Sequence, residues 1–331
     1  MDGSIKRYDP PKTAGQPLVT ALINTYNYAR YLPLAINSVL AQTYRNIEIV
    51  IVDDGSTDET PAVLAQYGDS IRVIRVKNGG QANAFNVGIP ASKGDLIMTL
   101  DADDLWLPSK VERMVEFAQQ YPNAGLLYHR FVNVDLNDVV LDQPQPQAGS
   151  LLMGDCRGQY LRSAGSYWHT ITSTMVLRPE IARRILPIPT YGVREGADSV
   201  LVDCCILLGD VASTHEVYAH RRLHGSNLYA AGREGHSRTD AVRADDVRRI
   251  EWRAEIVRQV MERLGVPFDI DIERNEWRII NLYLIGKRSF WSMAYACMTG
   301  PVHETLRARY LRVQWAADMR ANELARRRRV S

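Results

Sequence analysis

The first third of the chain alternates between two hydrophobic patterns. Short apolar runs rich in β-branched residues recur four times, at residues 18–23, 47–52, 71–76 and 96–100. Segments with helical spacing connect them, and the first connector has apolar residues on one face, at Leu32, Ile36, Val39 and Leu40. Strands joined by helical connectors predict right-handed crossovers and a mainly parallel α/β sheet that is buried on both faces.

Acidic residues stand at the ends of two of these runs. Asp53 and Asp54 end the second run, and Asp101, Asp103 and Asp104 end the fourth. Ligands of parallel sheets bind at the carboxyl ends of the strands. Three acids this close together repel one another unless a cation, a hydrogen-bond donor or water compensates them. The pattern therefore indicates a ligand or cation site at this edge of the sheet.

Each acidic run also has a simpler interpretation. Ser56, Thr57 or Asp58 can cap the helix that follows the second run, and Asp104 can cap a helix that begins near Pro108. The acids would then be turn residues in solvent. Neither run taken alone decides between a turn and a ligand site.

The rest of the chain is less regular. Residues 142–150 form a polar loop interrupted by prolines, and residues 229–241 have glycines and charges without periodicity, which predicts a mobile loop. A helical stripe of apolar residues follows, at Val247, Ile250, Ala254, Val257, Met261 and Leu264. The stripe is too short for a coiled-coil seam and favours an amphipathic packing helix that Gly265 and Pro267 end. A homodimer is left open.

Composition narrows the class of protein. The chain has 331 residues, of which 46% are hydrophobic and 24% charged, which is enough for a substantial core. A net charge of +2 does not indicate nucleic-acid binding. The cysteines lack C-x-x-C spacing, and neither a signal-peptide core nor a run of 18 apolar residues occurs. These features predict a cytoplasmic protein with reduced thiols.

Four motifs occur in order and at domain-like spacing. They are VTALINTYN at 19–27, VDDGSTD at 52–58, GGQANAFNVG at 79–88 and GDLIMTLDADD at 94–104. Together they resemble the large inverting glycosyltransferase family 2, over about residues 18–228. The resemblance implies the GT-A fold, in which a Rossmann-like, mostly parallel sheet is flanked by helices and binds a nucleotide-sugar.

The chain is then expected to have four parts. Residues 1–17 are an N-terminal tail, and residues 18–125 are the nucleotide-sugar-binding half of a GT-A domain. Residues 126–228 are the acceptor-binding half of the same domain, and residues 229–331 are a mobile loop and a C-terminal helical region. The donor sugar and the acceptor stay open, with a glycan, a lipid-linked glycan and a small molecule as alternatives.

The resemblance assigns a nucleotide site. It implies that Asp54 contacts the base, usually the uracil of a uridine nucleotide, and that three neighbours of the first strand line the same site: Asn24, Tyr26 and Asn27. Three amides of the third motif are candidates for hydrogen bonds to sugar or phosphate: Gln81, Asn83 and Asn86. Phe85 stands where many members have an arginine, and close helix packing explains the small residues of this motif equally well.

In the family that these motifs resemble, a D-x-D at the end of the fourth strand helps to bind a divalent cation, and the resemblance implies the same here. Asp101 and Asp103 would bind Mn2+ or Mg2+, which bridges to the diphosphate, and Asp101 is also a candidate for ribose. Hard carboxylate oxygens suit these ions, and a cation stabilises the charge of the leaving diphosphate. His224 is a candidate third ligand. Arg221 or Arg222 would neutralise the diphosphate through charge-assisted hydrogen bonds.

An inverting transfer also needs a general base for the acceptor hydroxyl. The resemblance points to REGADSVLVD at 194–203 and to Asp198 as this base. Ala197 stands where the family usually has glutamate. Asp203 and Glu195 are alternative bases, and helix capping is another interpretation of Asp198.

The end of the chain is basic. Between residues 307 and 331 there are eight arginines and only two acids, and four of the arginines are consecutive. A basic segment with apolar residues fits either contact with the anionic inner face of a membrane or a solvated, frayed terminus.

Two other enzyme classes and one non-enzymatic function are alternatives to the transferase. A sugar nucleotidyltransferase would need a glycine-rich basic loop after the first strand, and a dinucleotide oxidoreductase would need G-x-G-x-x-G there. The sequence NTYNYARY at 24–31 has neither. A nucleotide-sugar-binding scaffold without turnover is the non-enzymatic alternative, because Phe85 and Ala197 depart from the family pattern.

Overall fold

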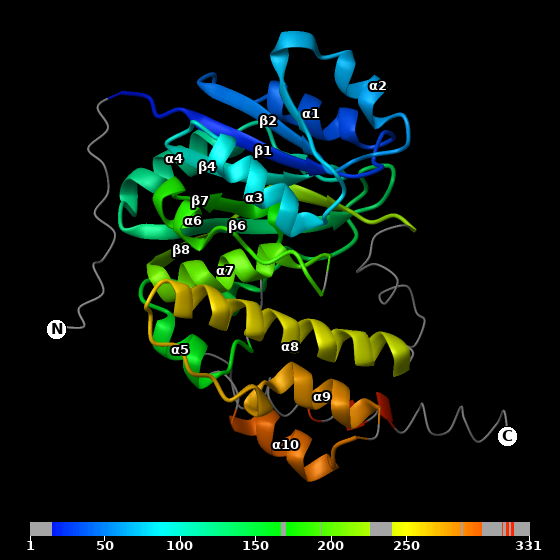
Figure 1. The fold of residues 1–331 in the computed structure, drawn as a ribbon, viewed down its shortest axis with the longest axis vertical. Coiled ribbons are helices and arrows are strands. Elements are labelled where there is room, and N and C mark those ends of the chain that lie inside the picture. The colour runs from blue at the N-terminus through cyan, green and yellow to red at the C-terminus, as the bar shows by residue number, and fades with distance from the viewer. Residues whose placement is uncertain are drawn as a thin grey trace, which may run out of the picture.

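One mixed sheet forms the centre of the molecule (Figure 1). The computed structural model describes residues 15–166, 170–192, 194–225, 240–285 and 287–299, together with residues 313, 316, 317, 319 and 320. Within these residues eight strands lie in the order β3-β2-β1-β4-β7-β6-β8-β5. The GT-A arrangement expected from the sequence is confirmed.

The parallel part of the sheet comes from the first third of the chain. Its strands are β1 (Val19–Thr25), β2 (Ile47–Asp53), β3 (Arg72–Arg75) and β4 (Leu96–Asp101). β1 lies between β2 and β4 and is parallel to both. Each of the four apolar runs forms one of these strands. β1, β2 and β4 are largely buried, because strands covered on both faces need apolar residues at successive positions, whereas the edge strand β3 is mostly exposed.

The second half extends the same sheet. Its strands are β5 (Leu105–Trp106), β6 (Ala124–Val134), β7 (Met175–Leu177) and β8 (Asp210–Arg222). β7 is antiparallel to both β4 and β6, and β6 is parallel to β8. The nucleotide half and the acceptor half predicted from the sequence therefore share one hydrogen-bonded sheet.

Helices cover both faces of the sheet. α1 (Leu32–Leu40) and α4 (Lys110–Gln120) lie on one face, where they pack on Ala21 and Ile23. α3 (Gln81–Ala91), α6 (Pro179–Ile185) and α7 (Ala197–Leu208) cover the other face, where they pack on Leu22. The alternation of β1 side chains between two cores follows from the twofold period of a strand. The remaining short helices are α2 (Thr60–Ala65), α5 (Arg157–Arg162), η1 (Gly68–Ser70), η2 (Ala148–Ser150), η3 (Thr172–Thr174) and η5 (Ile272–Arg274).

The C-terminal region is helical, as predicted. It contains α8 (Asp240–Arg263), α9 (Glu276–Leu284) and α10 (Phe290–Thr299), and Figure 1 shows α8 between α7 and the last two helices. α8 packs into the core around α7 through the last part of the predicted stripe, Val257, Met261 and Leu264, together with Ile256 and Val260, which were not predicted; the earlier stripe residues lie outside this core. The helix ends before Gly265, which has a φ of +66°. None of the helices among the described residues is long and apolar enough to span a membrane.

Two predictions fall largely outside the described residues. The mobile loop predicted at 229–241 is described only at its last two positions, which begin α8. The Arg-rich end is described only at residues 313, 316, 317, 319 and 320. The membrane contact predicted for that end therefore stays a prediction.

Candidate functional site

The carboxyl ends of β1, β2 and β4 bring the acidic motifs together. Asn24 of β1 pairs in register with Asp101 of β4, and Thr25 pairs with Asp53 of β2. Both amide atoms of the Asn24 side chain are buried and have no hydrogen-bond partner among the described residues. A buried amide costs free energy unless it is hydrogen-bonded, so this position favours a polar ligand at the strand ends.

Asp54 organises the loop that precedes α3. Its carboxylate accepts hydrogen bonds from the backbone nitrogens of Gly79 at 3.0 Å and Gly80 at 2.7 Å, and from Asn83 Nδ2 at 3.0 Å. Asp54 is only 4% exposed. The carboxylate therefore has a structural role in the apo protein, and its predicted contact with a base stays a prediction.

The loop after β1 shows a similar division of roles. Asn27 has a φ of +59°, and its Oδ1 accepts from the backbone nitrogen of Thr57 at 2.7 Å. Its own backbone nitrogen donates to Ser56 Oγ at 2.9 Å. Asn27 thus joins the two strand-end loops, whereas Tyr26 is exposed and open to a ligand. The N-cap position of α2 is Glu59, whose side chain makes no capping bond, so none of the three suggested residues is the N-cap. Asp58, one position earlier, accepts a hydrogen bond from the backbone nitrogen of Thr60 at 3.0 Å.

The D-x-D residues face different partners. Asp103 Oδ2 lies 3.0 Å from His224 Nε2, so β8 brings the predicted histidine to the predicted aspartate. The His224 ring stacks on Tyr31, with 4.5 Å between the ring centroids, and meets the edge of Tyr28. Because carboxylates and a histidine nitrogen meet here, the donor set is of the kind that binds Mn2+.

Asp104 is not the helix cap suggested by the sequence. α4 begins at Lys110, well beyond Asp104, and the Asp104 carboxylate is buried. It accepts from Ser173 Oγ at 2.5 Å and from the backbone nitrogen of Arg222 at 3.0 Å. Asp104 therefore ties the D-x-D turn to η3 and to the end of β8.

Burial and neighbouring acids raise the pKa values of Asp101 and Asp104. Burial, followed by the charges of Asp104, Asp103 and Asp198, raises the pKa of Asp101 well above its usual range. Burial and the charge of Asp103 raise the pKa of Asp104 to about 7. A divalent cation would relieve this repulsion. Among the described residues no three His, Cys, Asp or Glu side chains are arranged to hold a metal. The donor types fit a hard cation whose coordination a ligand's oxygens would complete.

The two arginines of β8 differ in direction. The Arg222 guanidinium is buried against the turn after β6, where it contacts Asp138 Oδ1 at 2.7 Å and the carbonyl of Asp135 at 3.2 Å. Successive strand residues face opposite sides. Arg221 therefore faces the side opposite to Arg222. Its positive charge offsets part of the rise in the pKa values of Asp104 and Asp198. Arg221 is the better placed diphosphate candidate, and the geometry argues against Arg222.

Asp198 lies in the first turn of α7, beside the D-x-D. Its Oδ2 accepts a hydrogen bond from Thr172 Oγ1 at 3.2 Å. Burial raises the pKa of Asp198, while hydrogen bonds and the charge of Arg221 act in the opposite direction. A carboxylate with a raised pKa and a partly exposed position can accept a proton from a ligand hydroxyl.

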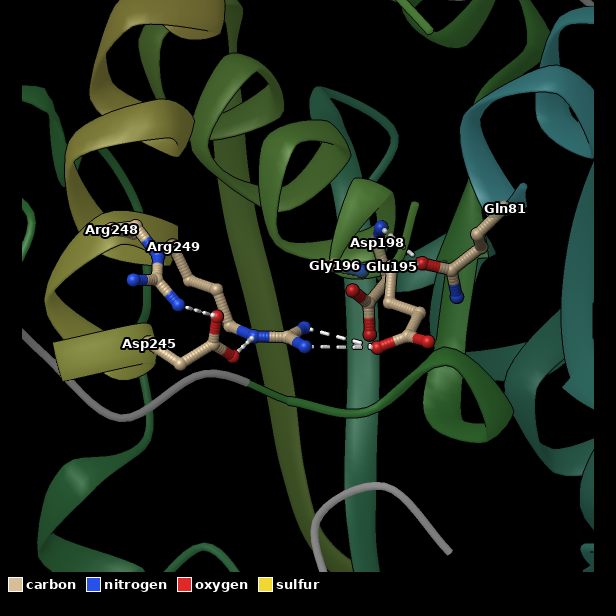
Figure 2. A network of polar contacts seen from close by, with 7 residues as sticks. All are labelled: Gln81, Glu195, Gly196, Asp198, Asp245, Arg248 and Arg249. Carbon is tan, nitrogen blue, oxygen red and sulfur yellow. Dashed lines mark hydrogen bonds and ion pairs between the residues drawn. The ribbon is translucent and has the colours of Figure 1, made fainter. Parts of the chain in front are cut away.

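The alternative bases have other partners. Asp203 is fully buried, where it accepts from Tyr160 Oη at 3.0 Å and lies 3.2 Å from Arg253 Nε. Its burial argues against a catalytic role. Glu195 accepts from both terminal nitrogens of Arg249 at 3.1 Å. Figure 2 shows Glu195 beside Asp198, with Arg249 on the side of α8.

Gln81 supports the loop of Asp198. Its Oε1 accepts from the backbone nitrogens of Gly196 at 3.0 Å and Asp198 at 3.3 Å (Figure 2). Its Nε2 donates to Thr172 Oγ1 at 3.2 Å. These contacts argue against the nucleotide contact predicted for Gln81. The other two amides of the motif also serve the fold: Asn83 binds Asp54, and Asn86 exchanges two hydrogen bonds with the backbone of Ile188.

Two site residues were not recognised in the sequence. Thr172 and Ser173 form η3, and Thr172 contacts Asp198 while Ser173 Oγ donates to Asp104 and accepts from the backbone nitrogen of Asp101. The carbonyl of Ser173 accepts from the side chains of Trp106 and Lys110. A Thr-Ser-Thr run has no pattern specific to a site, so no sequence signal was available.

Comparisons with known proteins agree with this geometry. The family model described as Glycosyl transferase family 2 matches residues 20–186. A Nostoc sp. (strain PCC 7120) protein named uncharacterized glycosyltransferase alr2836 is 36% identical over 280 residues, which are 83% of this chain and 84% of the relative.

Solved structures show the same fold. S. aureus TarS 1-349 in complex with UDP-GlcNAc matches with a TM-score of 0.57 and 14% identity, over 94% of this chain and 92% of that chain. Mannosyltransferase PcManGT from Pyrobaculum calidifontis, in complex with GDP-Man and Mn2+, matches with a TM-score of 0.50 and 19% identity, over 96% and 84%. The sequence match and the fold match agree, which decides against the nucleotidyltransferase and scaffold alternatives. The chain belongs to glycosyl transferase family 2 and is a nucleotide-sugar-dependent enzyme with a GT-A fold.

Proposed function

We propose that the protein transfers a sugar from a UDP-sugar to an acceptor hydroxyl with inversion at the anomeric carbon. The observation that carries this proposal is the short link between two acidic groups. Thr172 contacts Asp198, and the charge of Asp198 raises the pKa of Asp101. This proximity of Asp198 and the D-x-D supports a single site, in which the proposed base would face the acceptor where it meets the anomeric carbon of the donor.

Asp198 is the general base in this mechanism. It accepts the proton of the acceptor hydroxyl while the hydroxyl oxygen forms a bond to the anomeric carbon. The bond between that carbon and the diphosphate oxygen breaks on the opposite side, and the diphosphate leaves with the electron pair. Arg221 offsets part of this charge.

The D-x-D and His224 would hold Mn2+ or Mg2+. Asp101, Asp103 and His224 provide the oxygen and nitrogen donors that suit these ions. The cation would supply charge stabilisation to the diphosphate. The Mn2+ in the complex of the similar PcManGT supports this assignment.

A uridine nucleotide is the first donor to test. The similar TarS structure contains UDP-GlcNAc, whereas PcManGT contains GDP-Man, so a guanosine nucleotide is the second candidate. Asn24, Tyr26 and Asp54 are the proposed contacts of the base. The buried, unpartnered amide of Asn24 is the strongest local support for a polar ligand at this position.

Calorimetric titration of UDP with and without Mn2+ tests the donor. Metal-dependent binding that weakens in Asp103→Asn would support the proposal and justify a screen of UDP-sugars. In that screen Asp198→Asn should bind UDP normally and lose turnover. GDP binding without UDP binding would overturn the uridine assignment, and normal turnover of Asp198→Asn would overturn the assignment of the base.

A further inference from the structure

One face of α8 follows the loop that leads to Asp198. Arg263 Nη1 donates to the carbonyl of Pro187 at 2.8 Å, at the start of the loop. Trp252 Nε1 donates to the carbonyl of Tyr191 at 2.8 Å, near its middle. Gln259 also contacts the Tyr191 hydroxyl, at 2.6 Å. The helix therefore runs antiparallel to the loop and contacts it along its length.

A further contact of α8 reaches the end of the loop, just before α7. Both terminal nitrogens of Arg249 donate to Glu195 Oε2 at 3.1 Å, three residues before Asp198. Asp245, one turn earlier in α8, accepts from Arg249 Nε at 2.7 Å and orients the guanidinium (Figure 2). Arg249 and Glu195 are 26% and 33% exposed, so the pair is partly shielded from water.

The loop and α8 also pack closely at Gly192. Gly192 has a φ of +87°, and a Cβ at this position would lie 2.7 Å from the ring of Trp252. The loop therefore approaches α8 more closely than a side chain at position 192 would permit. Along an adjacent stripe α8 is anchored to α7, because Val257 and Val260 lie in the same core as α7 and Arg253 lies 3.2 Å from Asp203.

The loop is held from a second side by α3. The carbonyl of Arg194 accepts from the backbone nitrogen of Gln81 at 2.8 Å, and the Gln81 side chain binds Gly196 and Asp198. Glu195 lies between Arg194 and Gly196, which both contact Gln81. Among the described side chains, only Arg249 forms an ion pair with Glu195. Loss of that pair would release one side of the segment and leave the Gln81 side in place.

We propose that Arg249 is a positioning residue for Asp198, acting through Glu195, and that α8 contributes to the position of the base through this one contact. This inference depends on the proposed role of Asp198 as the base. It adds a residue that lies beyond the segment 20–186 matched by the family. A small displacement of a base lowers the rate of proton transfer, while the nucleotide contacts on β1, β2 and β4 stay intact.

The test compares Arg249→Gln, Glu195→Gln and the double variant in a UDP-sugar turnover assay. We expect kcat to fall by about tenfold in each, with the donor KM and the affinity for UDP unchanged. The double variant should fall no further than the single variants, because both remove the same contact. Arg258→Gln is the matched control: Arg258 lies on the same helix, pairs with Glu255 at 2.7 Å, and should leave kcat unchanged.

Three results would overturn the inference. They are unchanged kcat in Arg249→Gln, additive losses in the double variant, and weakened UDP binding together with a lowered Tm, which would indicate general destabilisation. Asp198→Asn in the same assay separates this inference from the proposed function. If Asp198→Asn is inactive and Arg249→Gln is normal, only the positioning role fails; if Asp198→Asn turns over normally, the base assignment fails first.

Discussion

Thr172 is shared by the two acids of the proposed mechanism. Its hydroxyl donates to Asp198 Oδ2 at 3.2 Å, and it also lowers the pKa of Asp101. In Thr172→Val the carboxylate of Asp198 loses a donor, so its proton is held more tightly and its pKa rises. The acid limb of the kcat/KM profile should therefore move to higher pH. Thr172→Ser retains the hydroxyl and is the control, and an unmoved limb in Thr172→Val would contradict the contact.

Ser173 stabilises the D-x-D turn through two hydrogen bonds of its hydroxyl group. Its Oγ donates to the buried carboxylate of Asp104 at 2.5 Å and accepts from the backbone nitrogen of Asp101 at 3.1 Å. Ser173→Ala would leave both groups short of a partner, which typically costs about 1–3 kcal/mol. Urea denaturation should show this loss, whereas Ser70→Ala at an exposed position should stay within about 0.5 kcal/mol of the parent. Equal stabilities would show that water replaces the hydroxyl.

The strands were predictable where burial imposes a pattern. The four apolar runs form β1 to β4, and the α1 stripe is confirmed except at Leu40, which is exposed at the last residue of its helix. β5 and β7 have two and three residues, too few for a periodic signal. The hydrophobic pattern therefore predicted β1 to β4. It left β5 to β8 unassigned, including the long strands β6 and β8, which have 11 and 13 residues.

The site was predictable only where a motif ends a strand. Asp101 is the last residue of β4 and Asp103 comes two positions later, so their position near the ends of β1 and β2 follows from the sheet order. The partners of these acids come from elsewhere in the chain: Ser173 lies 69 positions from Asp104, and Arg249 lies 54 positions from Glu195. Such contacts depend on tertiary packing, which leaves no local pattern in the sequence.

The approach of α3 to the loop before α7 depends on a glycine. Gly80 has a φ of +85°, and a Cβ there would lie 2.5 Å from the carbonyl oxygen of Arg194. Gly80→Ala should cost more than about 2 kcal/mol and lower kcat, because it adds a backbone clash to the strain of a positive φ. Gly68→Ala is a matched control with a φ of +50° and no atom within 4 Å of the added Cβ. If thermal denaturation shows equal losses, the clash is absent.

The two halves of the domain cooperate at one edge of the sheet. β4 supplies the D-x-D, β8 brings His224 to Asp103, and α7 brings Asp198 to Thr172. The helical region after β8 is not a separate appendage, because α8 shares a core with α7 and contacts the loop before it. In the proposed mechanism, donor binding, metal binding and base positioning would therefore depend on segments spread from β1 to α8.

Because the metal ligands come from both halves, metal binding should stabilise the whole domain. Asp103 follows β4 and His224 follows β8, so a cation between them binds the folded chain and not the unfolded one. Mn2+ at one hundred times its Kd should add about 2.7 kcal/mol to the free energy of unfolding. Thermal denaturation with Mn2+ should show a raised Tm for the parent protein and for Asp69→Asn, an exposed control, but not for Asp103→Asn. A similar rise in Asp103→Asn would mean that the cation binds elsewhere, and the D-x-D would then act on the nucleotide without it.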